Sequence, residues 1–342
     1  MSKATLGQFY TTNYEYILQG FSLPVDVKSI IEPFCGNGDL ISFVHKFNPL
    51  LIPEEYDIDP KRPTTIKRDT LAHPPMYTSK FVITNPPWIA RNKSVSKSLY
   101  DLYGENDLYK CFIRSLISSG PDGGIIIVPL NFFCSIRKSD ISLRKDFLEQ
   151  YDITVVNVFE TPVFDDTKYA ACSFQFRKKL LRDSPTQFII FPLQTKLTLI
   201  LSDFNNYMIG GEVYKITGNP VYHISRLVEE PCDQFATNIV VKCLDDNKSS
   251  MIRMMMVDSS ARIIDRTPRK SNRTYMTLAI KPAISLATQE QLVAQFNMYM
   301  SDMRQKYCSL FLPNFRESSD LSRKRIPFDL VYLISGKLLS TF

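Results

Sequence analysis

With 342 residues, of which 44% are hydrophobic and 22% charged, the chain is long enough for two domains with well-filled cores. No apolar run reaches the about 18 residues that a membrane span needs, and the first residues lack the apolar core of a signal peptide. The seven cysteines form no Cys-x-x-Cys pair and the three histidines are far apart in sequence. We therefore expect an intracellular (cytoplasmic) protein with no metal site and no membrane association.

The net charge of +6 arises entirely in the second half of the chain. Up to residue 174 there are 18 Lys and Arg against 20 Asp and Glu, whereas the remainder has 23 against 15. A basic half joined to a nearly neutral half favours a polyanion as partner. A solvated basic surface without a partner would have the same composition.

Apolar and amphipathic runs alternate through the first half. The sequence predicts strands at 29–34, 54–58, 65–69, 80–87, 125–130, 153–160 and 170–178, and helices at 36–47, 107–119 and 137–150. Strands that alternate with helices indicate a parallel sheet covered on both faces. The last two strands have too little sequence between them for a crossover helix, so we expect an antiparallel hairpin at the sheet edge.

After about residue 180 the pattern changes to short apolar runs separated by proline, glycine and polar clusters. Residues 266–273 form a basic, loop-like stretch, and 289–307 have apolar residues at helical spacing. We therefore expect two domains, at 1–180 and 181–342, the second of mixed structure.

Suitable polar groups follow the first three predicted strands. Gly36 and Gly38 open a helix, where the backbone can approach a ligand closely and the helix N-terminus favours a negative group. Asp57 lies 21 residues after Gly36, where an acid can accept hydrogen bonds from ribose hydroxyls, and Asp59 is an alternative. Asp69 can bind an adenine amine or cap a helix. Together these strand ends predict a site for a nucleotide-like ligand.

The stretch FVITNPPWIAR (81–91) ends a buried-type strand with an asparagine, two prolines and the only tryptophan of the chain. The side-chain oxygen of Asn85 and the carbonyl of Pro86 can both accept hydrogen bonds, and the prolines stiffen the loop so that these acceptors converge. An amino group that donates to both would have its lone pair exposed for attack. Trp88 offers a face to a planar ring. The alternative is a proline-rich turn with a core tryptophan.

As a set, these motifs resemble those of S-adenosylmethionine-dependent amino-methyltransferases, specifically the gamma-group (TaqI-type) DNA N6-adenine methyltransferases. The resemblance covers about residues 5–180 and is carried by GQFYTT (7–12), EPFCGNGD (32–39), YDIDP (56–60), RDTL (68–71), NPPW (85–88) and VFDDTKYAACSFQF (163–176). In the family these segments are, in order, the N-terminal cofactor motif, the glycine motif, the ribose-binding acid, the adenine-binding acid, the catalytic tetrapeptide and the segment whose aromatic residue stacks on the flipped base. That residue would be Phe164.

The resemblance implies a doubly wound, seven-stranded class I methyltransferase (Rossmann-like) α/β sheet with an antiparallel edge strand, followed by a mixed C-terminal target-recognition domain. It implies S-adenosylmethionine as cofactor, bound by Gln8, Tyr10, Thr11, Thr12, Glu32, Phe34, Gly36, Gly38, Asp57, Ile58, Asp69 and Asn85. The catalytic residues would be Asn85, Pro86, Pro87 and Trp88, with Trp88 and Phe164 stacking on the target base. Thr12 and Trp88 depart from the commoner residues, proline and tyrosine or phenylalanine, and neither departure removes a needed function.

The C-terminal stretch NFRESSDLSRKRIPFDLVY (314–332) resembles one in methyltransferases that modify CATG. Its cationic side chains are suited to phosphates or guanine edges. With the basic stretch at 266–273, the expected DNA-binding residues are Arg266, Arg269, Lys270, Arg273, Arg316, Arg323, Lys324 and Arg325. By itself, such a cluster also fits a solvated face.

The sequence therefore predicts an enzyme that transfers the methyl group of S-adenosylmethionine to N6 of an adenine flipped out of duplex DNA, in functional pairing with a restriction endonuclease. The alternatives are methylation of adenine in RNA, methylation of glutamine in protein, and a non-catalytic DNA-binding module. The glutamine enzymes place their substrate domain before the catalytic half, whereas here the extra domain follows it. A non-catalytic module would be expected to have lost at least one motif, and none is broken here. An enzyme that acts on RNA is poorly distinguished by sequence from one that acts on DNA.

Overall fold

The chain divides into two units, Met1–Tyr207 and Met208–Phe342. The computed structural model describes residues 7, 9–165, 167, 169–180, 184–228, 233–245, 251–265, 274–317 and 322–342. Among the helices in these ranges, none is long and apolar enough to cross a membrane.

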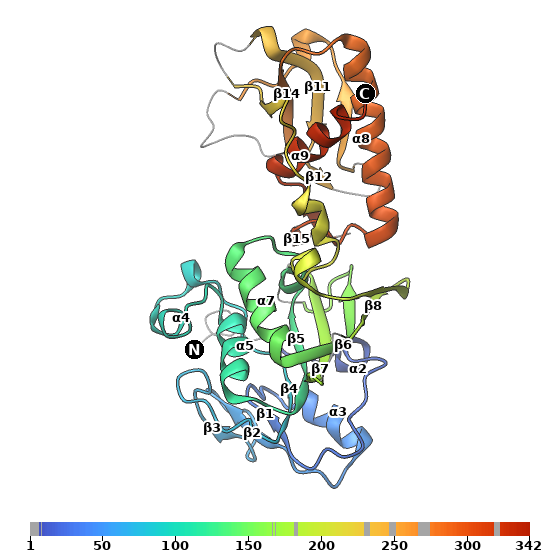
Figure 1. Ribbon diagram of the computed structural model, residues 1–342. Helices are drawn as coiled ribbons and strands as arrows, with labels where there is room; N and C mark the ends of the chain where they lie inside the picture. The colour runs from blue at the N-terminus through green and yellow to red at the C-terminus, as the bar shows by residue number, and fades with distance from the viewer. Residues whose placement is uncertain are drawn as a thin grey trace. The chain divides into compact units, whose positions relative to one another are not determined.

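The first unit is built on a nine-stranded sheet with the order β3-β2-β1-β4-β5-β7-β6-β8-β9 (Figure 1). Its strands are β1 (Ile30–Glu32), β2 (Glu54–Asp57), β3 (Ile66–Lys67), β4 (Phe81–Thr84), β5 (Gly123–Pro129), β6 (Tyr151–Phe159), β7 (Ala171–Lys178), β8 (Thr186–Phe191) and β9 (Thr195–Leu199). Its helices are α2 (Tyr14–Ile17), α3 (Asp39–Phe47), α4 (Ser98–Tyr103), α5 (Leu108–Ser119), α6 (Asn131–Cys134) and α7 (Lys138–Gln150), with short 3-10 turns η1 (Arg91–Lys93) and η2 (Asp203–Asn205). The α/β class expected from the alternating pattern is confirmed.

Two details of the expected sheet are wrong. The sheet has nine strands and not seven, because β8 pairs with β6 in parallel and β9 pairs with β8. The expected hairpin of β6 and β7 forms, but β7 lies inside the sheet, between β5 and β6, and is antiparallel to both. The antiparallel strand at the outer edge is β9. The first unit consequently continues beyond residue 180, since the apolar runs of β8 and β9 extend its sheet.

Strand β7 shows how the sheet separates its two faces. Ser173 donates from Oγ to the carbonyl of Ile17 in α2, 2.6 Å away, on one face. The next residue, Phe174, stacks on Phe132 of α6 with ring centroids 5.5 Å apart, on the other face. Successive side chains of a strand point to opposite faces. Helices α2 and α3 therefore cover one face, and α5, α6 and α7 cover the other (Figure 1).

Strand β4 occupies the centre of the sheet, between β1 and β5, and is parallel to both. All four of its residues are buried, which explains the unbroken run of β-branched and aromatic side chains. Because β1, β2, β3 and β4 are parallel, the segments that follow them emerge at one edge of the sheet. The polar groups predicted at these strand ends are therefore brought to one place.

The second unit contains a four-stranded antiparallel sheet, a three-stranded sheet and two helices. The four-stranded sheet has the order β10 (His223–Arg226), β14 (Tyr275–Lys281), β11 (Ala236–Lys242) and β13 (Arg253–Met256). The three-stranded sheet has the order β12 (Leu244–Asp245), β16 (Ser322–Arg325) and β15 (Asn314–Glu317). Helix α8 (Leu286–Tyr307) packs on β13 and β11, and α9 (Phe328–Leu339) packs on β10, with 3-10 turns η3 (Gly211–Lys215), η4 (Asp233–Phe235) and η5 (Ser259–Ala261).

The core of the second unit follows helical spacing. Leu292, Phe296 and Met300 of α8 recur every four residues and are fully buried, as are Val331 and Ile334 of α9. Ser285 caps α8 by accepting a hydrogen bond from the backbone N–H of Thr288.

Candidate active site

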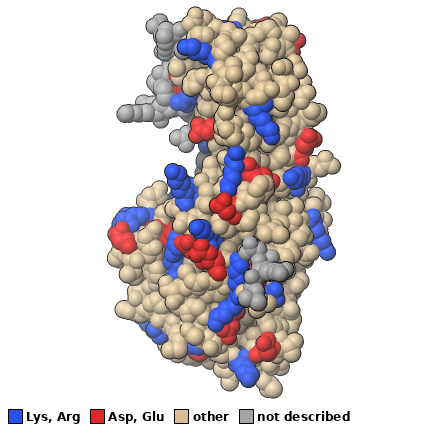
Figure 2. Space-filling view, viewed as in Figure 1, with Lys and Arg blue, Asp and Glu red and all other residues tan. Residues whose placement is uncertain are grey.

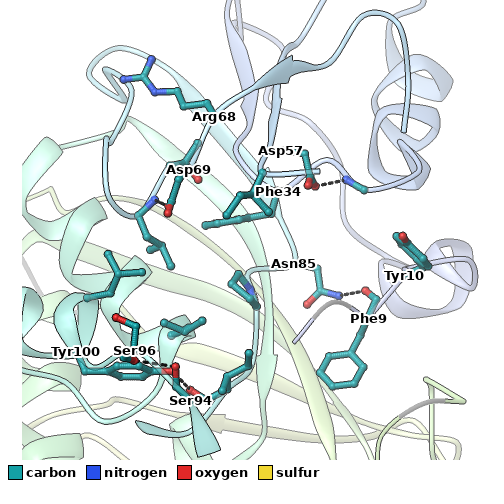
Figure 3. A pocket seen from close by; sticks show the side chains of 18 residues that line it. Phe9, Tyr10, Phe34, Asp57, Arg68, Asp69, Asn85, Ser94, Ser96 and Tyr100 are labelled. Atoms are coloured by element: carbon teal, nitrogen blue, oxygen red, sulfur yellow. Dashed lines mark hydrogen bonds between the residues drawn. The ribbon is translucent and has the colours of Figure 1, made fainter. Parts of the chain in front are cut away.

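A cavity of about 200 Å³ opens where β1, β2, β3 and β4 end (Figure 3). Eight residues predicted from the sequence line it: Tyr10, Phe34, Gly36, Asp57, Ile58, Asp69, Asn85 and Pro87. The other lining residues are Phe9, Arg68, Thr70, Leu71, Ile89, Ser94, Ser96, Leu99, Tyr100 and Leu108. Seven described residues of the prediction lie outside the lining: Thr11, Thr12, Glu32, Gly38, Pro86, Trp88 and Phe164. Gln8 lies outside the described residues.

The glycine turn between β1 and α3 is held by an acid on the neighbouring strand. Gly36 has a φ of 53°, and a Cβ atom added there would lie 3.1 Å from the ring of Tyr10. Asp57 accepts a hydrogen bond from the backbone N–H of Gly36 at Oδ2 and from that of Asp59 at Oδ1, both 2.8 Å long. The side chain of Asp59 instead pairs with Lys61 at the surface. Of the two acids, Asp57 is the one that faces the cavity.

Glu32, at the end of β1, is a buried carboxyl group that ties β1 to β4. Its Oε1 accepts hydrogen bonds from Thr84 Oγ1 at 2.6 Å and from the backbone N–H of Phe34 at 3.1 Å. Burial raises the pKa of Glu32 to about 8, against which the two hydrogen bonds act only in part. Glu32 therefore holds the side chain of Thr84, the residue before Asn85.

Asp69 caps a turn, and it also lies at the cavity. Its Oδ1 accepts from the backbone N–H groups of Leu71 and Ala72, at 3.1 and 3.0 Å, and so caps the turn that follows β3. Asp69 also lines the cavity (Figure 3). Oδ1 of Asp69 thus holds the turn, and Oδ2 takes no part in the bonds to Leu71 and Ala72.

Asn85 is oriented by the N-terminal segment. Its Nδ2 donates to the backbone carbonyl of Phe9 at 2.8 Å and to Thr11 Oγ1 at 3.3 Å (Figure 3). The bond to Phe9 assigns the two ends of the amide, because a backbone carbonyl oxygen can only accept. Its Oδ1 is buried and has no hydrogen-bond partner among the described residues. A buried acceptor without a partner is costly, and such an acceptor at a cavity is suited to a donor that arrives with a ligand.

The two aromatic residues predicted to hold a base lie together, with a third that the sequence did not single out. The rings of Trp88 and Phe164 are 5.4 Å apart and stand at 88° to each other. Phe9 contacts both, at 5.1 Å from Trp88 and 6.1 Å from Phe164. Trp88 is 5% exposed and Phe164 7%. The edge-to-face arrangement is favourable for the rings themselves, and it differs from two parallel faces that enclose a base.

The wall of the cavity beyond the NPPW loop was missed by the sequence analysis. Ile89 is held at its carbonyl by the backbone N–H of Leu108 at 3.1 Å and by the hydroxyl of Tyr100 at 3.0 Å. Ser94 and Ser96 belong to the same connection between β4 and α5. Ile89, Ser94 and Ser96 come from an irregular segment without a period, so their convergence with Tyr100 of α4 has no local signal in the sequence.

The structure describes only part of the expected DNA-binding set. Arg266, Arg269, Lys270 and Arg273 lie outside the described residues. Arg316 of β15 lies opposite Arg323 of β16 in the antiparallel register. Lys324 is 6% exposed and lies opposite Asp245, so it belongs to the interior of the small sheet and is not a surface cation. Arg323 and Arg325 flank it on the other face of the strand.

The surface of the first unit has charges of both signs, as its nearly equal numbers of basic and acidic residues lead one to expect. Figure 2 shows Lys and Arg side chains interspersed with Asp and Glu on the visible face of this unit. Among the described residues, no three His, Cys, Asp or Glu side chains converge as metal ligands would.

Comparison with known proteins gives one family match. Residues 76–164 match the family described as Eco57I restriction-modification methylase, and this segment includes the NPPW loop and Phe164. The match is to methyltransferases of the restriction-modification type. A search of the curated proteins finds no match.

Comparison with solved structures finds matches at low sequence identity. A type I restriction-modification methyltransferase subunit from Streptococcus thermophilus is 15% identical over 52% of this chain and 44% of its own, with a TM-score of 0.39. The type IIG restriction endonuclease BpuSI is 14% identical over 66% and 36%, with a TM-score of 0.43. The type IIL enzyme MmeI, solved in complex with DNA, is 12% identical over 62% and 40%, with a TM-score of 0.41. The chain spans less than half the length of each of these structures.

Proposed function

We propose that the protein transfers the methyl group of S-adenosylmethionine to N6 of an adenine that is extruded from duplex DNA. The observation that carries the proposal is the state of Asn85, whose Nδ2 is anchored by Phe9 and Thr11 while its Oδ1 is a buried acceptor without a described partner. An amino group supplies a donor of the kind that such an oxygen lacks. The family match over residues 76–164 supports methyl transfer as the reaction.

The cavity fits S-adenosylmethionine in the chemistry of its lining. The Gly36 turn leaves room beside Tyr10 that a Cβ atom would narrow, and Phe34 offers an aromatic face. Asp57 and Asp69 are acceptors suited to ribose hydroxyls and an adenine amine. When bound, S-adenosylmethionine would supply an electrophilic methyl group. The residues that would hold it are Tyr10, Phe34, Gly36, Asp57, Ile58 and Asp69, which line the cavity, whereas we assign Asn85 to the target amine.

The residues of the NPPW loop would act by positioning and by electrostatics. Asn85 Oδ1, with the carbonyl of Pro86, would accept the two hydrogens of the target amine and so orient its lone pair toward the methyl donor. The nitrogen becomes positively charged as it gains the methyl group, and the preorganised acceptors stabilise that charge before the extra proton leaves. Displacement of this kind needs no metal ion and no separate nucleophile on the protein.

We further assign target-base binding to Trp88 and Phe164, and recognition of the DNA sequence to the second unit. Extruding a base costs a few kcal/mol, and contact with aromatic rings offsets part of that cost. In the second unit we assign contacts with phosphates or guanine edges to Arg323 and Arg325, which belong to the expected DNA-binding set. Functional pairing with a restriction endonuclease, and CATG as the site, remain predictions of the resemblance.

One experiment separates the proposal from its rivals. Labelled S-adenosylmethionine is incubated with duplex DNA, with duplex RNA of the same sequence, and with protein, and the labelled product is hydrolysed and identified. We expect N6-methyladenine from DNA alone, formed about 10²–10³-fold more slowly by the Asn85→Ala variant. Label in 4-methylcytosine would refute the choice of base, label in RNA or in glutamine would favour the corresponding rival, and no transfer to any acceptor would favour a non-catalytic module.

A second measurement tests the role of the second unit. Arg323→Ala and Arg325→Ala are titrated against cognate and scrambled duplexes at two salt concentrations. A phosphate contact should weaken binding to both duplexes and lower the salt slope by about one unit, whereas a bidentate contact to guanine should cost about 1–3 kcal/mol at the cognate site only. Wild-type affinity for both variants would mean that these arginines do not contact DNA.

A further inference from the structure

The turn between β1 and α3 is held by two acids of β2. Asp57 accepts a hydrogen bond from the backbone N–H of Gly36, which lines the cavity (Figure 3). The backbone N–H of Gly38 donates to the carbonyl of Cys35 at 2.8 Å and closes the turn. The second acid, Glu55, is 6% exposed, and its Oε2 accepts from Cys35 Sγ at 3.5 Å. Both acids lie on one face of β2, because side chains two residues apart in a strand point the same way.

Arg62 joins Glu55 to the far end of this turn. Its Nε lies 3.2 Å from Glu55 Oε2 and its Nη2 lies 3.3 Å from Oε1, so the guanidinium and the carboxylate meet as two forks. Thr64 and Thr65 donate from their hydroxyls to Glu55 Oε2, both at 3.0 Å. The carboxylate is therefore fixed in place, and Arg62 balances its buried charge.

The same guanidinium covers Gly38. This glycine is the N-cap of α3 and has a φ of 83°. A Cβ atom added to it would lie 2.6 Å from Cδ and 2.8 Å from Cζ of Arg62, so a side chain at position 38 would displace the guanidinium. A cation at the N-terminus of a helix is unfavourable by itself, because the backbone N–H groups there carry partial positive charge. Glu55, and not the helix, therefore holds Arg62 against Gly38.

We propose that Arg62 is a positioning residue for the cofactor, which acts through Glu55 to keep residues 35–38 in the conformation that lines the cavity. The inference rests on the proposed function, because it assumes that S-adenosylmethionine occupies this cavity. The described lining of the cavity does not include Arg62, so Arg62 would act on the turn and not on the ligand. Asp57 would hold one end of the turn and Arg62 the other, so that the turn is formed before the cofactor binds.

Calorimetric titration of the full chain with S-adenosylmethionine tests this role. Arg62→Ala should weaken binding about tenfold, the scale of one hydrogen bond between charged groups. Arg62→Lys keeps the charge but has no fork, so its binding should remain at least about threefold weaker than that of the wild type. Lys61→Ala is the matched control, because it removes the neighbouring cation, whose partner Asp59 is at the surface. Wild-type affinity in Arg62→Ala, full recovery in Arg62→Lys, or an equal loss in Lys61→Ala would each overturn the inference.

A double-mutant cycle separates an action through Glu55 from a direct contact with the ligand. Glu55→Gln should weaken cofactor binding to a similar extent as Arg62→Ala. The double variant should lose no more than either single variant, because both changes release the same end of the turn. Losses that multiply would show two independent effects and would contradict the inference.

Gly38→Ala provides a second cycle that leaves both charges in place. In the wild-type background the added methyl group displaces Arg62 and also strains a positive φ, whereas in the Arg62→Ala background only the strain remains. The substitution should therefore weaken cofactor binding at least about threefold more in the wild type than in Arg62→Ala. Equal losses in the two backgrounds would refute the contact on which the inference depends.

Amide hydrogen exchange tests the turn without any ligand. The backbone N–H groups of Gly36 and Gly38 both donate hydrogen bonds that depend on the turn. Arg62→Ala should speed the exchange of these two amides about tenfold and leave the amides of β4 unchanged, whereas unchanged exchange at both glycines would overturn the inference. A wild type that binds no S-adenosylmethionine would overturn the proposed function as well, whereas equal binding by the wild type and all variants would overturn only the role of Arg62.

Discussion

Replacing Asn85 by alanine is the most direct perturbation of the proposed chemistry. The change removes the buried Oδ1 acceptor and leaves the carbonyl of Phe9 and the hydroxyl of Thr11 without the Nδ2 donor. Losing one preorganised group that stabilises transition-state charge typically costs about 2.7–4 kcal/mol, or a factor of about 10²–10³ in kcat. Two lost hydrogen bonds should lower the free energy of unfolding by about 1–3 kcal/mol. Cofactor affinity should change little, because Asn85 acts on the amine.

The assay is single-turnover methyl transfer with saturating cofactor, beside calorimetric titration of S-adenosylmethionine. Asn85→Asp is the informative companion, since it keeps an acceptor but turns a carboxylate oxygen toward the carbonyl of Phe9. Thr11→Val removes only the longer of the two anchoring bonds and should cost less than about tenfold. Near-normal turnover of Asn85→Ala would refute the reasoning, and so would a loss that is fully explained by weaker cofactor binding.

Three other predictions concern buried charge and the cofactor site. The pKa of Glu32 is raised to about 8 in the folded chain. Between pH 4.5 and 8 the folded chain therefore binds more protons than the unfolded chain. Its free energy of unfolding falls as the pH rises through this range, by up to about 1.4 kcal/mol per pH unit. Glu32→Gln should flatten this dependence in urea unfolding at pH 5 to 8, and an unchanged slope would mean that the carboxyl is ionised in the fold. Lys110 and Asp140 form a buried ion pair with 2.5 Å between Nζ and Oδ1. Lys110→Met should lower the free energy of unfolding by about 3–5 kcal/mol, and the double variant with Asp140→Leu should lower it much less. Equal losses for the single and double variants would show that the pairing is immaterial. Asp57→Ala should weaken binding of S-adenosylmethionine by about 1.5–3 kcal/mol without changing DNA affinity, and calorimetry that finds the loss in Asp59→Ala instead would move the role to Asp59.

Most strands of the first unit could be predicted because each has its own local signal. The run FVIT of β4 and the run GGIIIVP of β5 are buried on both faces, and their composition shows it. Strand β8 was assigned to the wrong domain because only its parallel pairing with β6 places it in the sheet. Pairing between distant segments depends on the packed fold, and no property of the segment TQFIIF reveals its partner.

The residues of the candidate site also fall into those that have a local signal in the sequence and those that are placed only by the packed fold. Asp57, Asp69 and Asn85 were predicted because acids and amides at the ends of parallel strands converge by geometry. Phe9 was missed, although its carbonyl orients Asn85 and its ring touches Trp88, because it comes from an irregular segment far away in sequence. Lys324 looked like a surface cation in a basic run, and its burial could be learned only from its pairing opposite Asp245.

The position of β7 inside the sheet has a consequence for synthesis on the ribosome. Strand β5 emerges long before β7, so its edge, with the run Ile125–Val128, stays open until β6 and β7 have both left the tunnel. An open, apolar strand edge is prone to pair with other chains. The hairpin of β6 and β7 can form from local contacts and then dock as one piece, closing that edge in a single event. A fragment that stops before β7 should therefore aggregate, and the shortest well-behaved fragment of this unit should include β7, with β8 and β9 to cover the far side of β6.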